Sequence, residues 1–477
     1  MPCAAFSPDL TASEQARYLY EHIPPGLFKV VEEDKTVAWR IAPEPFPLSP
    51  DTLSRIEQIG NDLLAFYRAL NGLYNRSARG NAPAFIAEYL DLGKPEHIIR
   101  LSRQNRFKQD IPGVIRPDLI LTDKGFIAAE LDSVPGGMGF VGAMAETYCN
   151  LGMESIGGAS GIPQGFGAMV TATSGAEKPI VAIVVSEESK DYRPEMGWLT
   201  QALNRQGSVG AHICAPQDLI FTEDALFIRM DDGREEKIDV LYRNFELFDL
   251  LNVPKQDLLL YAARHNRVRM TPPAKAQLEE KLAFALLHHP ELASLWRAEF
   301  GAEVFKRLRA LFPLTWVIDP RPIPPQAVIY GLQVNGEAVS DWMRLVALGK
   351  SDRDFVVKPS GFSELAWGSR GVRVANDLSK EAWADTLQQA LREYDKTPRI
   401  LQRFHKGKRV RQSYFDENAG DIRSFDGRVR LCPYFFVTGN QTELGGILAT
   451  VAPADKRLIH GMSEAVMAPC TLKDGGN

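Results

Sequence analysis

Several features that would assign the chain to a special class of protein are scarce or missing. Its five cysteines among 477 residues form no CxxC pair and show no regular spacing. The cysteines therefore predict neither a disulfide framework nor a thiolate metal site. No apolar run approaches the roughly 18 residues of a membrane span, and residues 1–9 lack the basic and apolar regions of a signal peptide. We therefore expect a cytoplasmic protein without a membrane partner.

An excess of positive charge is also missing. The net charge is -5 at pH 7, which argues against nucleic acid as a partner, because phosphate binding needs a basic excess. One local basic cluster runs from His405 to Arg411. This cluster fits a solvated strand edge as well as part of a nucleotide pocket. The balance of 45% hydrophobic and 24% charged residues is that of an ordinary globular protein.

Common catalytic motifs are absent as well. The sequence contains no GxxxxGK[ST] phosphate loop, no GxSxG nucleophile elbow and no HExxH zinc motif. These absences argue against the P-loop, α/β-hydrolase and zincin classes of enzyme. His288 and His289 are adjacent on a predicted helix, so their rings diverge and we expect them at the surface.

The spacing of apolar residues changes along the chain and predicts an α+β protein of several parts. Apolar residues from Leu53 to Tyr74 recur every three to four positions, which predicts one long helix. A buried strand at 180–185, a helix at 196–205 and a strand at 240–243 predict a small parallel α/β unit. The predicted parts are a mainly helical region (1–110), a mixed region (111–177), the small α/β unit (178–255), a helical segment with a Pro-rich linker (256–330) and a second mixed region (331–470).

The strongest group of charged residues is a predicted β-hairpin with acids at both ends. Arg116 and Asp118 open its first strand, and Glu130 and Asp132 close its second. Because the start of one strand lies beside the end of its partner, Asp118 can face the other two acids. Three converging carboxylates repel one another unless a cation such as Mg²⁺ neutralises them, and Arg116 would clamp a phosphate there. A solvated acidic hairpin explains the spacing equally well.

A second group of residues follows much later in the chain. An apolar strand ends at Lys358 and continues into a loop of small residues that includes Ser360 and Gly361. The Lys358 ammonium and the N–H groups of the loop could together bind a phosphate. The alternative is that the Lys358 side chain only lies along the protein surface. The strand from 399 to 404 could receive an adenine ring or belong to the core, and Arg430 stands on an otherwise apolar strand.

Taken in this order, these pieces resemble the circularly permuted ATP-grasp proteins, including the synthetase domain of glutathionylspermidine synthetase. The resemblance covers about residues 110–465. Its most specific part is Arg-x-Asp followed by Glu-x-Asp, placed before the phosphate-binding lysine rather than after it. It implies that 111–177 is the metal-binding part, 331–470 the nucleotide-binding part, and 178–255 an inserted domain of the pre-ATP-grasp type.

The resemblance also implies a role for each matching residue. By it, the Mg²⁺ ligands are Asp118, Glu130 and Asp132; the catalytic residues are Arg116 and Lys358; the ATP-binding residues are Lys358, Ser360, Gly361, Gln402, Arg403, Phe404 and Arg430; and Ser186 and Arg243 border the acceptor pocket. The position of Asp132 is often Asn in the family, which changes the charge of the site by one unit.

The expected activity is that of an ATP- and Mg²⁺-dependent carboxylate–amine ligase that acts through an acylphosphate. Its partners would be a small-molecule or peptide carboxylate and an amine, including a polyamine. Two alternatives stay open at this point. One is a non-catalytic nucleotide-binding protein with a regulatory or assembly role, and the other is an enzyme that transfers phosphate to a stable product.

Overall fold

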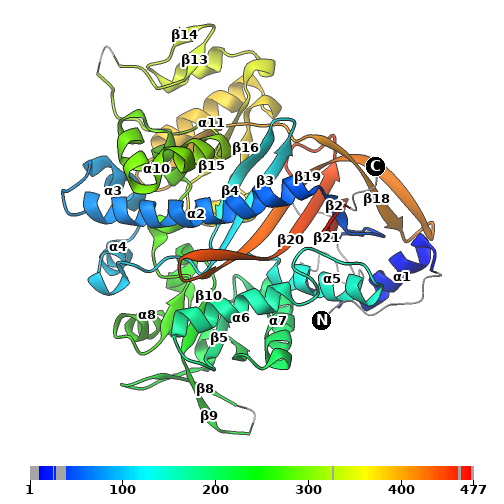
Figure 1. Ribbon diagram of the computed structural model, residues 1–477. Helices are drawn as coiled ribbons and strands as arrows, with labels where there is room; N and C mark the ends of the chain where they lie inside the picture. The colour runs from blue at the N-terminus through cyan, green and yellow to red at the C-terminus, as the bar shows by residue number, and fades with distance from the viewer. Residues whose placement is uncertain are drawn as a thin grey trace.

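The computed structural model describes six stretches of the 477-residue chain. They are residues 10–24, 26–27, 39–230, 232–324, 327–459 and 464–473. Residues 1–9, in which no signal peptide is expected, lie outside them. None of the described helices has the length and apolar character needed to cross a membrane. The fold is a mixed α/β arrangement with several sheets and covering helices (Figure 1).

The central element is an eight-stranded sheet. Its order is β1-β21-β20-β19-β3-β4, with β18 paired to β19 and β2 paired to β21. The strands are β1 (Arg40–Ile41), β2 (Phe46–Leu48), β3 (Val114–Thr122), β4 (Gly125–Asp132), β18 (Arg409–Asp416), β19 (Asp421–Thr438), β20 (Gln441–Pro453) and β21 (Val466–Leu472). Since β3 pairs antiparallel with β19, the predicted regions 111–177 and 331–470 contribute to one sheet. The predicted acidic hairpin is confirmed as β3 and β4.

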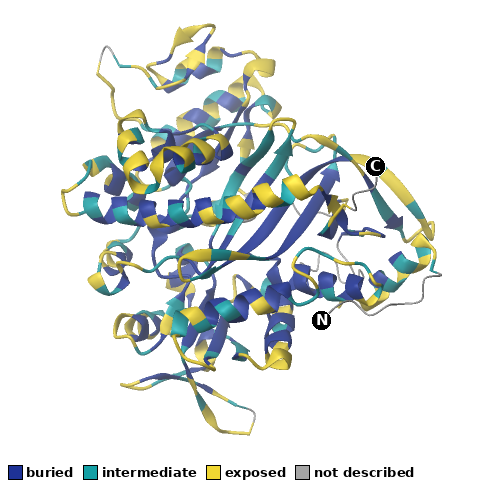
Figure 2. Cartoon of the chain, in the orientation of Figure 1, coloured by how far each residue is buried: buried dark blue, intermediate teal, exposed yellow. Residues whose placement is uncertain are grey.

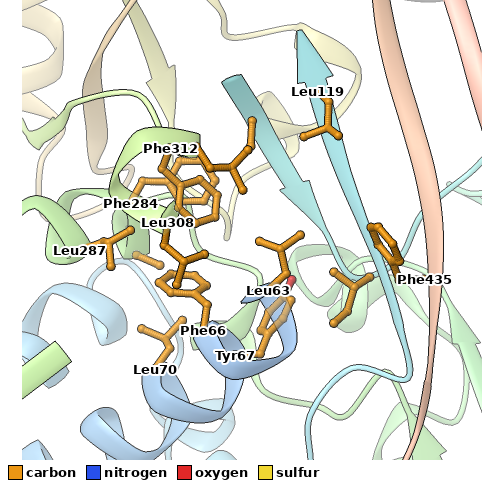
Figure 3. Close-up of a cluster of buried hydrophobic side chains, with 14 of the residues drawn as sticks. Leu63, Phe66, Tyr67, Leu70, Leu119, Phe284, Leu287, Leu308, Phe312 and Phe435 are labelled. Carbon is orange, nitrogen blue, oxygen red and sulfur yellow. The ribbon is translucent and has the colours of Figure 1, made fainter. Parts of the chain in front are cut away.

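One face of this sheet is covered by the long helix α2. The periodicity predicted this helix, and it runs from Pro50 to Ser77. Ser49 caps it by accepting a hydrogen bond from the Thr52 N–H, and Pro50 suits the first turn because no N–H is needed there. The helices packed beside α2 are α3 (Ala84–Asp91), α9 (Leu282–His288) and α10 (Ala293–Leu311). Figure 3 shows the apolar core between these helices and the sheet.

The other face of the sheet is covered by α5 (Met138–Asn150) and α6 (Gly161–Ser174). Successive side chains of a strand point to opposite faces. Leu431 therefore joins the core under α2, whereas Cys432 joins the core under α5 and α6. The central strands are buried along much of their length, as Figure 2 shows.

The predicted small parallel unit is confirmed. It is a four-stranded sheet in the order β11-β10-β5-β6, and every pair in it is parallel. Its elements are β5 (Ile180–Val185), α7 (Arg193–Gln206), β6 (Gly210–Cys214), β10 (Val240–Asn244), α8 (Gln256–Arg264) and β11 (Arg269–Thr271). Strand β11 lies in the segment that was expected to be helical. The sequence did not predict this strand, because three residues are too few to show a periodic pattern. A small antiparallel sheet extends the unit with β7 (Leu219–Phe221), β8 (Leu226–Arg229) and β9 (Glu235–Ile238).

A third sheet has the order β12-β17-β15-β16 and is antiparallel. Its strands are β12 (Thr315–Val317), β15 (Phe355–Pro359), β16 (Arg373–Val374) and β17 (Arg399–Arg403). Helix α11 (Lys380–Arg392) packs on this sheet, and Ser379 caps it as its sequence predicts. The remaining elements are α1 (Ala12–His22), α4 (Glu96–Ser102), β13 (Gln333–Val334) and β14 (Glu337–Ala338).

One expectation about a single residue is wrong, and one cysteine forms a disulfide that the sequence did not predict. His288 is only 6% exposed, because it ends α9 against the core and its Nε2 lies 3.1 Å from the Phe312 carbonyl oxygen. Cys149 is disulfide-bonded, although the spacing of the cysteines gave no sign of a disulfide. The thiols of Cys214, Cys432 and Cys470 are free and buried.

Candidate functional site

The acidic hairpin fixes the positions of four charged residues. In the register of β3 and β4, Asp118 lies opposite Glu130 and Arg116 lies opposite Asp132. A register shift follows directly after this pair, because Leu119 lies opposite Ala128 and β4 therefore has one extra residue, Ala129. Such irregularities re-aim side chains and are frequent beside active sites.

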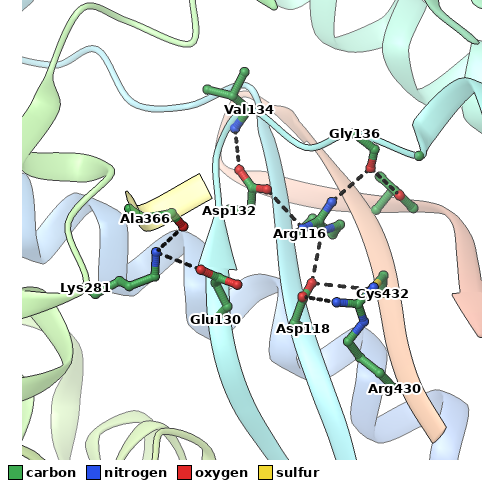
Figure 4. Close-up of polar contacts among 12 residues, drawn as sticks. Arg116, Asp118, Glu130, Asp132, Val134, Gly136, Lys281, Ala366, Arg430 and Cys432 are labelled. Atoms are coloured by element: carbon green, nitrogen blue, oxygen red, sulfur yellow. Dashed lines mark hydrogen bonds and ion pairs between the residues drawn. The ribbon is translucent and has the colours of Figure 1, made fainter. Parts of the chain in front are cut away.

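Each carboxylate of the hairpin is bound by a cation (Figure 4). Asp118 accepts from Arg116 Nε at 3.1 Å and from Arg430 Nη1 at 2.9 Å. Arg116 also reaches Asp132 through Nη2 at 3.0 Å. Glu130 lies 2.8 Å from the Nζ of Lys281, on the chain just before α9. Arginine and lysine therefore hold the carboxylate charges in a largely buried place.

These contacts set the protonation of the three acids. Burial disfavours the charge of Asp118, but the Arg116 and Arg430 guanidiniums outweigh it and lower its pKa. Burial also opposes the charge of Glu130, yet the ammonium groups of Lys281 and Lys358 lower its pKa. For Asp132 burial prevails over Arg116, and its pKa is raised. Asp118 and Glu130 are thus anionic at neutral pH, which is the state that binds a cation.

Lys358 ends strand β15 beside the hairpin. Its Nζ donates to the Ala129 carbonyl at 2.7 Å, and the residue is 8% exposed. Burial lowers the pKa of Lys358 to about 8, although the neighbouring Glu130 carboxylate opposes this shift. A buried ammonium with one carbonyl partner keeps donors for an anionic ligand.

A basic cavity of about 360 Å³ opens over β15, β17 and β4. Its cationic residues are Lys358, Arg403, Lys406, Arg409, Arg428, Arg430 and Arg457. Its wall also includes Gln402 and Phe404, together with apolar residues such as Ile127, Val356 and Leu458. A cavity with one apolar wall and an excess of cations suits a planar base that carries phosphates.

An acidic cavity of about 210 Å³ lies on the other side of the hairpin ends. Its carboxylates are Asp118, Glu130, Asp132, Glu246 and Glu279, whereas its cations are Arg116, Lys281 and Arg430. Burial raises the pKa of Glu246 well above its ordinary value, and the nearby carboxylate of Glu279 adds to this effect. A positive charge bound beside Glu246 and Glu279 would offset the burial that raises their pKa values, so this cavity favours a positively charged group.

The two cavities meet at the hairpin. Asp118, Glu130 and Arg430 line both of them, together with Ala366. A ligand in the basic cavity and a ligand in the acidic cavity would therefore both reach the same pair of carboxylates. This is the arrangement needed for transfer of a group between two bound molecules.

A glycine turn closes one side of the acidic cavity and is supported from behind by Glu195. This residue of α7 is fully buried and accepts from the N–H groups of Gly137 at 2.7 Å and Phe140 at 3.1 Å. Burial raises the pKa of Glu195 to about 7, while these N–H groups oppose the shift. Gly136 packs so closely that a Cβ there would lie 2.2 Å from the Tyr192 ring. By accepting hydrogen bonds from N–H groups at the start of α5, Glu195 holds the glycine turn in place.

Most residues singled out from the sequence line one of the two cavities, but four positions differ from expectation. Gly361 lines the acidic cavity instead of the basic one. Ser360 is 1% exposed, lines neither cavity and donates to Glu280. Ser186 and Arg243 also line neither cavity. Arg243 is fully buried and is paired with Glu279, while Ser186 lies 3.1 Å from the hydroxyl of Ser189 in the cavity wall. These two residues support the wall from behind.

Sequence reasoning did not find Lys281, Glu246 and Glu279. Lys281 follows two acids in Glu279-Glu280-Lys281, a pattern that reads as a solvated surface. Glu246 follows β10 within an apolar stretch, and its isolation among apolar residues was the only signal available.

The donor set of the hairpin is compatible with Mg²⁺ bound together with phosphates. Asp118 and Glu130 offer oxygen atoms alone, which Mg²⁺ prefers, and they face the basic cavity. Among the described residues, no three acid, imidazole or thiol groups lie close enough to enclose a metal ion. The protein thus offers part of a coordination sphere, and the oxygens of a bound phosphate would complete it. The metal role of Asp118, Glu130 and Asp132 stays a prediction.

No protein-family model matches the chain. No curated protein matches its sequence either. Among solved structures, the chain is similar to the apo form of a glutathione synthetase-like effector from Globodera pallida, with 12% identity, 97% of each chain covered and a TM-score of 0.59. It also aligns with a candidate gamma-glutamylcysteine synthetase from Methylobacillus flagellatus KT, with 12% identity, 80% of this chain and 85% of that chain covered, and a TM-score of 0.40. The first of these shows that the chain has a glutathione synthetase-like fold.

Proposed function

We propose that the protein is an ATP- and Mg²⁺-dependent carboxylate–amine ligase, built as a circularly permuted ATP-grasp protein related to glutathionylspermidine synthetase. The observation that carries this proposal is that a basic cavity and an acidic cavity share Asp118, Glu130 and Arg430. The order of the acids and Lys358 along the chain supports the permuted arrangement. The likeness to a glutathione synthetase-like structure supports the class of reaction at the level of the fold.

In this proposal the basic cavity holds ATP. The adenine contacts the wall around Gln402 and Phe404, and Lys358 and Arg430 bind the phosphates. Asp118, Glu130 and Asp132 would hold Mg²⁺ through their carboxylate oxygens, and the ion would offset the phosphate charge. Lys358 and Arg430 hold donors toward the basic cavity, so the protein needs little rearrangement to stabilise the transferring group.

The acidic cavity holds the carboxylate and amine substrates. An oxygen of the substrate carboxylate attacks the γ-phosphorus, the bond from that phosphorus to the bridging oxygen breaks, and ADP leaves. Arg116 and Lys281 offset the charge of the acylphosphate that results. The amine nitrogen then attacks the acyl carbon, and phosphate leaves as the amide forms. Glu246 and Glu279 favour an amine substrate that carries further positive charge.

The test of this function is ATP-dependent amide formation. Purified protein with MgATP is incubated with paired panels of carboxylates and amines, including peptides and polyamines. ADP release is measured and products are identified by mass spectrometry. We expect ADP and an amide in equal amounts for one pair, and neither with Glu130→Gln. A phosphorylated stable product would instead identify a phosphotransferase. If no pair releases ADP and Glu130→Gln binds nucleotide as the natural protein does, the ligase proposal is wrong.

A second candidate is a non-catalytic nucleotide-binding protein. The observation in its favour is that Arg116, Arg430 and Lys281 already neutralise the hairpin acids without a metal. Calorimetry separates the two candidates. A catalytic site requires ATP binding that strengthens with Mg²⁺, whereas equal affinity with and without Mg²⁺ supports the second candidate.

A further inference from the structure

A separate cleft lies on the outer side of α2, near the loop after α4. Its volume is about 340 Å³, and it shares no lining residue with the basic or acidic cavity. Its charged lining residues are Arg68, Arg76, Arg79 and Lys108, and no acid lines it. The other lining residues are glycine and amide side chains. The protein as a whole has a net charge of -5, so an overall excess of basic residues does not explain the cations gathered in this cleft.

Among the residues that the structure describes, no carboxylate forms an ion pair with three of the four cations. Arg68 donates to the Gly439 carbonyl at 2.7 Å, and Arg79 donates to the amide oxygen of Asn105 at 2.8 Å. These acceptors are neutral, so they orient the guanidiniums without cancelling their charge. Within the described residues, no hydrogen bond or ion pair of the Lys108 ammonium is found.

The fourth cation, Arg76, forms an ion pair with Glu299 of α10. This pair fixes the guanidinium at the edge of the cleft. An arginine has five donors, and a single carboxylate leaves several of them available to a second anion. Arg76 can therefore still contribute to binding an oxyanion.

The floor of the cleft is formed by buried, hydrogen-bonded amides and has a buried cation beneath it. Asn71 and Asn75 are 4% and 5% exposed. The Asn71 side chain donates to the Lys108 carbonyl at 2.8 Å and accepts from Lys275 Nζ at 3.0 Å. Lys275 is 1% exposed, and burial lowers its pKa to about 8 while the nearby Asp110 carboxylate opposes this shift, so the ammonium is mostly charged at pH 7 and partly offset by Asp110.

Gly72 gives the cleft its depth. A glycine inside a helix costs roughly 1 kcal/mol relative to alanine, so its presence calls for a reason. At Gly60 of the same helix the reason is packing, because a Cβ would lie 2.5 Å from the Phe435 ring. At Gly72 the nearest atoms to such a Cβ belong to the Arg76–Glu299 ion pair, with Arg76 Nη1 at 3.7 Å and Glu299 Oε2 at 3.9 Å. Packing does not require this glycine, whereas a side chain there would project into the space between the arginines.

We propose that this cleft is a binding site for a small molecule with two or more oxyanion groups, either phosphates or carboxylates. Guanidinium and ammonium groups on two sides match several oxygens at once, and the neighbouring amides add neutral donors. None of the described lining residues is aromatic or large and apolar, so the cleft suits a compact polyanion more than a nucleotide with its planar base. This site is independent of the proposed ligase reaction.

The test is calorimetric titration of the intact protein with pyrophosphate and, separately, with citrate. We expect pyrophosphate to bind at two sites, one in the basic cavity and one in the cleft. Lys358→Gln should weaken the first alone. Lys108→Gln should weaken the second by about tenfold, as expected when one charge-assisted hydrogen bond is lost. Arg55→Gln is the matched control, because Arg55 is exposed on α2 outside the cleft.

Gly72→Leu separates shape from charge. It keeps every cation, fills the cleft and favours the helix, so it should abolish the second site without lowering the melting temperature. Citrate binding at that site would assign it to carboxylates as well as phosphates, and pyrophosphate binding alone would assign it to phosphates. If Lys358→Gln removes all pyrophosphate binding, or if Gly72→Leu and Lys108→Gln bind both probes as the natural protein does, the cleft is not an anion site.

Discussion

Asp118 and Glu130 lie directly opposite each other in the β3–β4 hairpin, and each is bound by a cation from a distant part of the chain. Arg430 of β19 binds Asp118, and Lys281 binds Glu130. The two carboxylates also line both cavities. Their environment therefore decides whether a metal and a phosphate can bind together at this place.

Glu130→Gln should abolish Mg²⁺-dependent ADP formation, with a loss of at least about 100-fold, the size of effect seen when one electrostatic contact to a transition state is removed. The side chain of Glu130 is 35% exposed, so the fold should survive the change. ADP release and thermal melting test both points. Asp123→Asn is the control, because Asp123 is exposed at the turn of the same hairpin and should be neutral. Full activity of Glu130→Gln would contradict the metal role.

Lys358→Gln should weaken ATP binding by about tenfold or more, because one ammonium–phosphate contact is lost. Stability should change little, since burial already lowers the pKa of Lys358 to about 8 and its charged form is costly there. Titration with ATP at pH 7 measures the affinity. Lys350→Gln, an exposed lysine shortly before β15, is the matched control. Equal weakening in both variants would point to general electrostatics instead of a direct contact.

Glu246→Gln should raise the KM for the amine substrate by about tenfold and leave the KM for ATP unchanged. Glu246 lines the acidic cavity but not the basic one. A cationic amine bound beside Glu246 would favour the charged form of this carboxyl despite its raised pKa, and an amide cannot supply that charge. Initial rates with each substrate varied in turn would show the effect. An equal change in both KM values would contradict the assignment of the acidic cavity to the amine.

Glu195 should make stability depend on pH near neutrality. Its pKa in the folded protein is about 7, above the ordinary value of 4.5. The folded state thus holds the proton more tightly, so the contribution of Glu195 is fully present below pH 4.5 and is lost as pH rises through about 7. Glu195→Gln cannot titrate and should show a smaller fall in the free energy of unfolding from pH 5 to 8. Denaturant unfolding at several pH values tests this, and parallel curves for the two proteins would refute it.

Gly139→Ala and Gly197→Ala should have opposite effects on stability. A Cβ at Gly139 would lie 2.0 Å from the backbone oxygen of Glu195, which cannot move without shifting α7. We expect a loss of several kcal/mol, as for other overpacked sites. At Gly197, on α7, no atom lies within 4 Å of such a Cβ, so alanine should stabilise by up to about 1 kcal/mol. Melting temperatures of the two variants measure the contrast.

The sequence was informative wherever short-range patterns decide structure. The apolar spacing of α2, the Ser379 cap of α11 and the β3–β4 hairpin all depend on residues near one another in the chain. For this reason the pairing of Asp118 with Glu130 could be predicted. His288 was misplaced because adjacency on a helix does not show which face the tertiary fold covers.

By itself, then, the sequence determined the local elements, the small parallel unit and the position of the acids at the ends of a hairpin. Only the tertiary structure decided which cations bind those acids and which cavities the acids line. Arg430 is 312 residues from Asp118 and reaches it because β19 pairs with β3. Other non-local contacts placed Lys281, Glu246 and Glu279 around the acids and formed the basic and acidic cavities beside them. Hydrogen bonds within a turn of helix or a hairpin follow from neighbouring residues, whereas the burial and charge environment of a side chain depend on segments that the chain brings together only on folding.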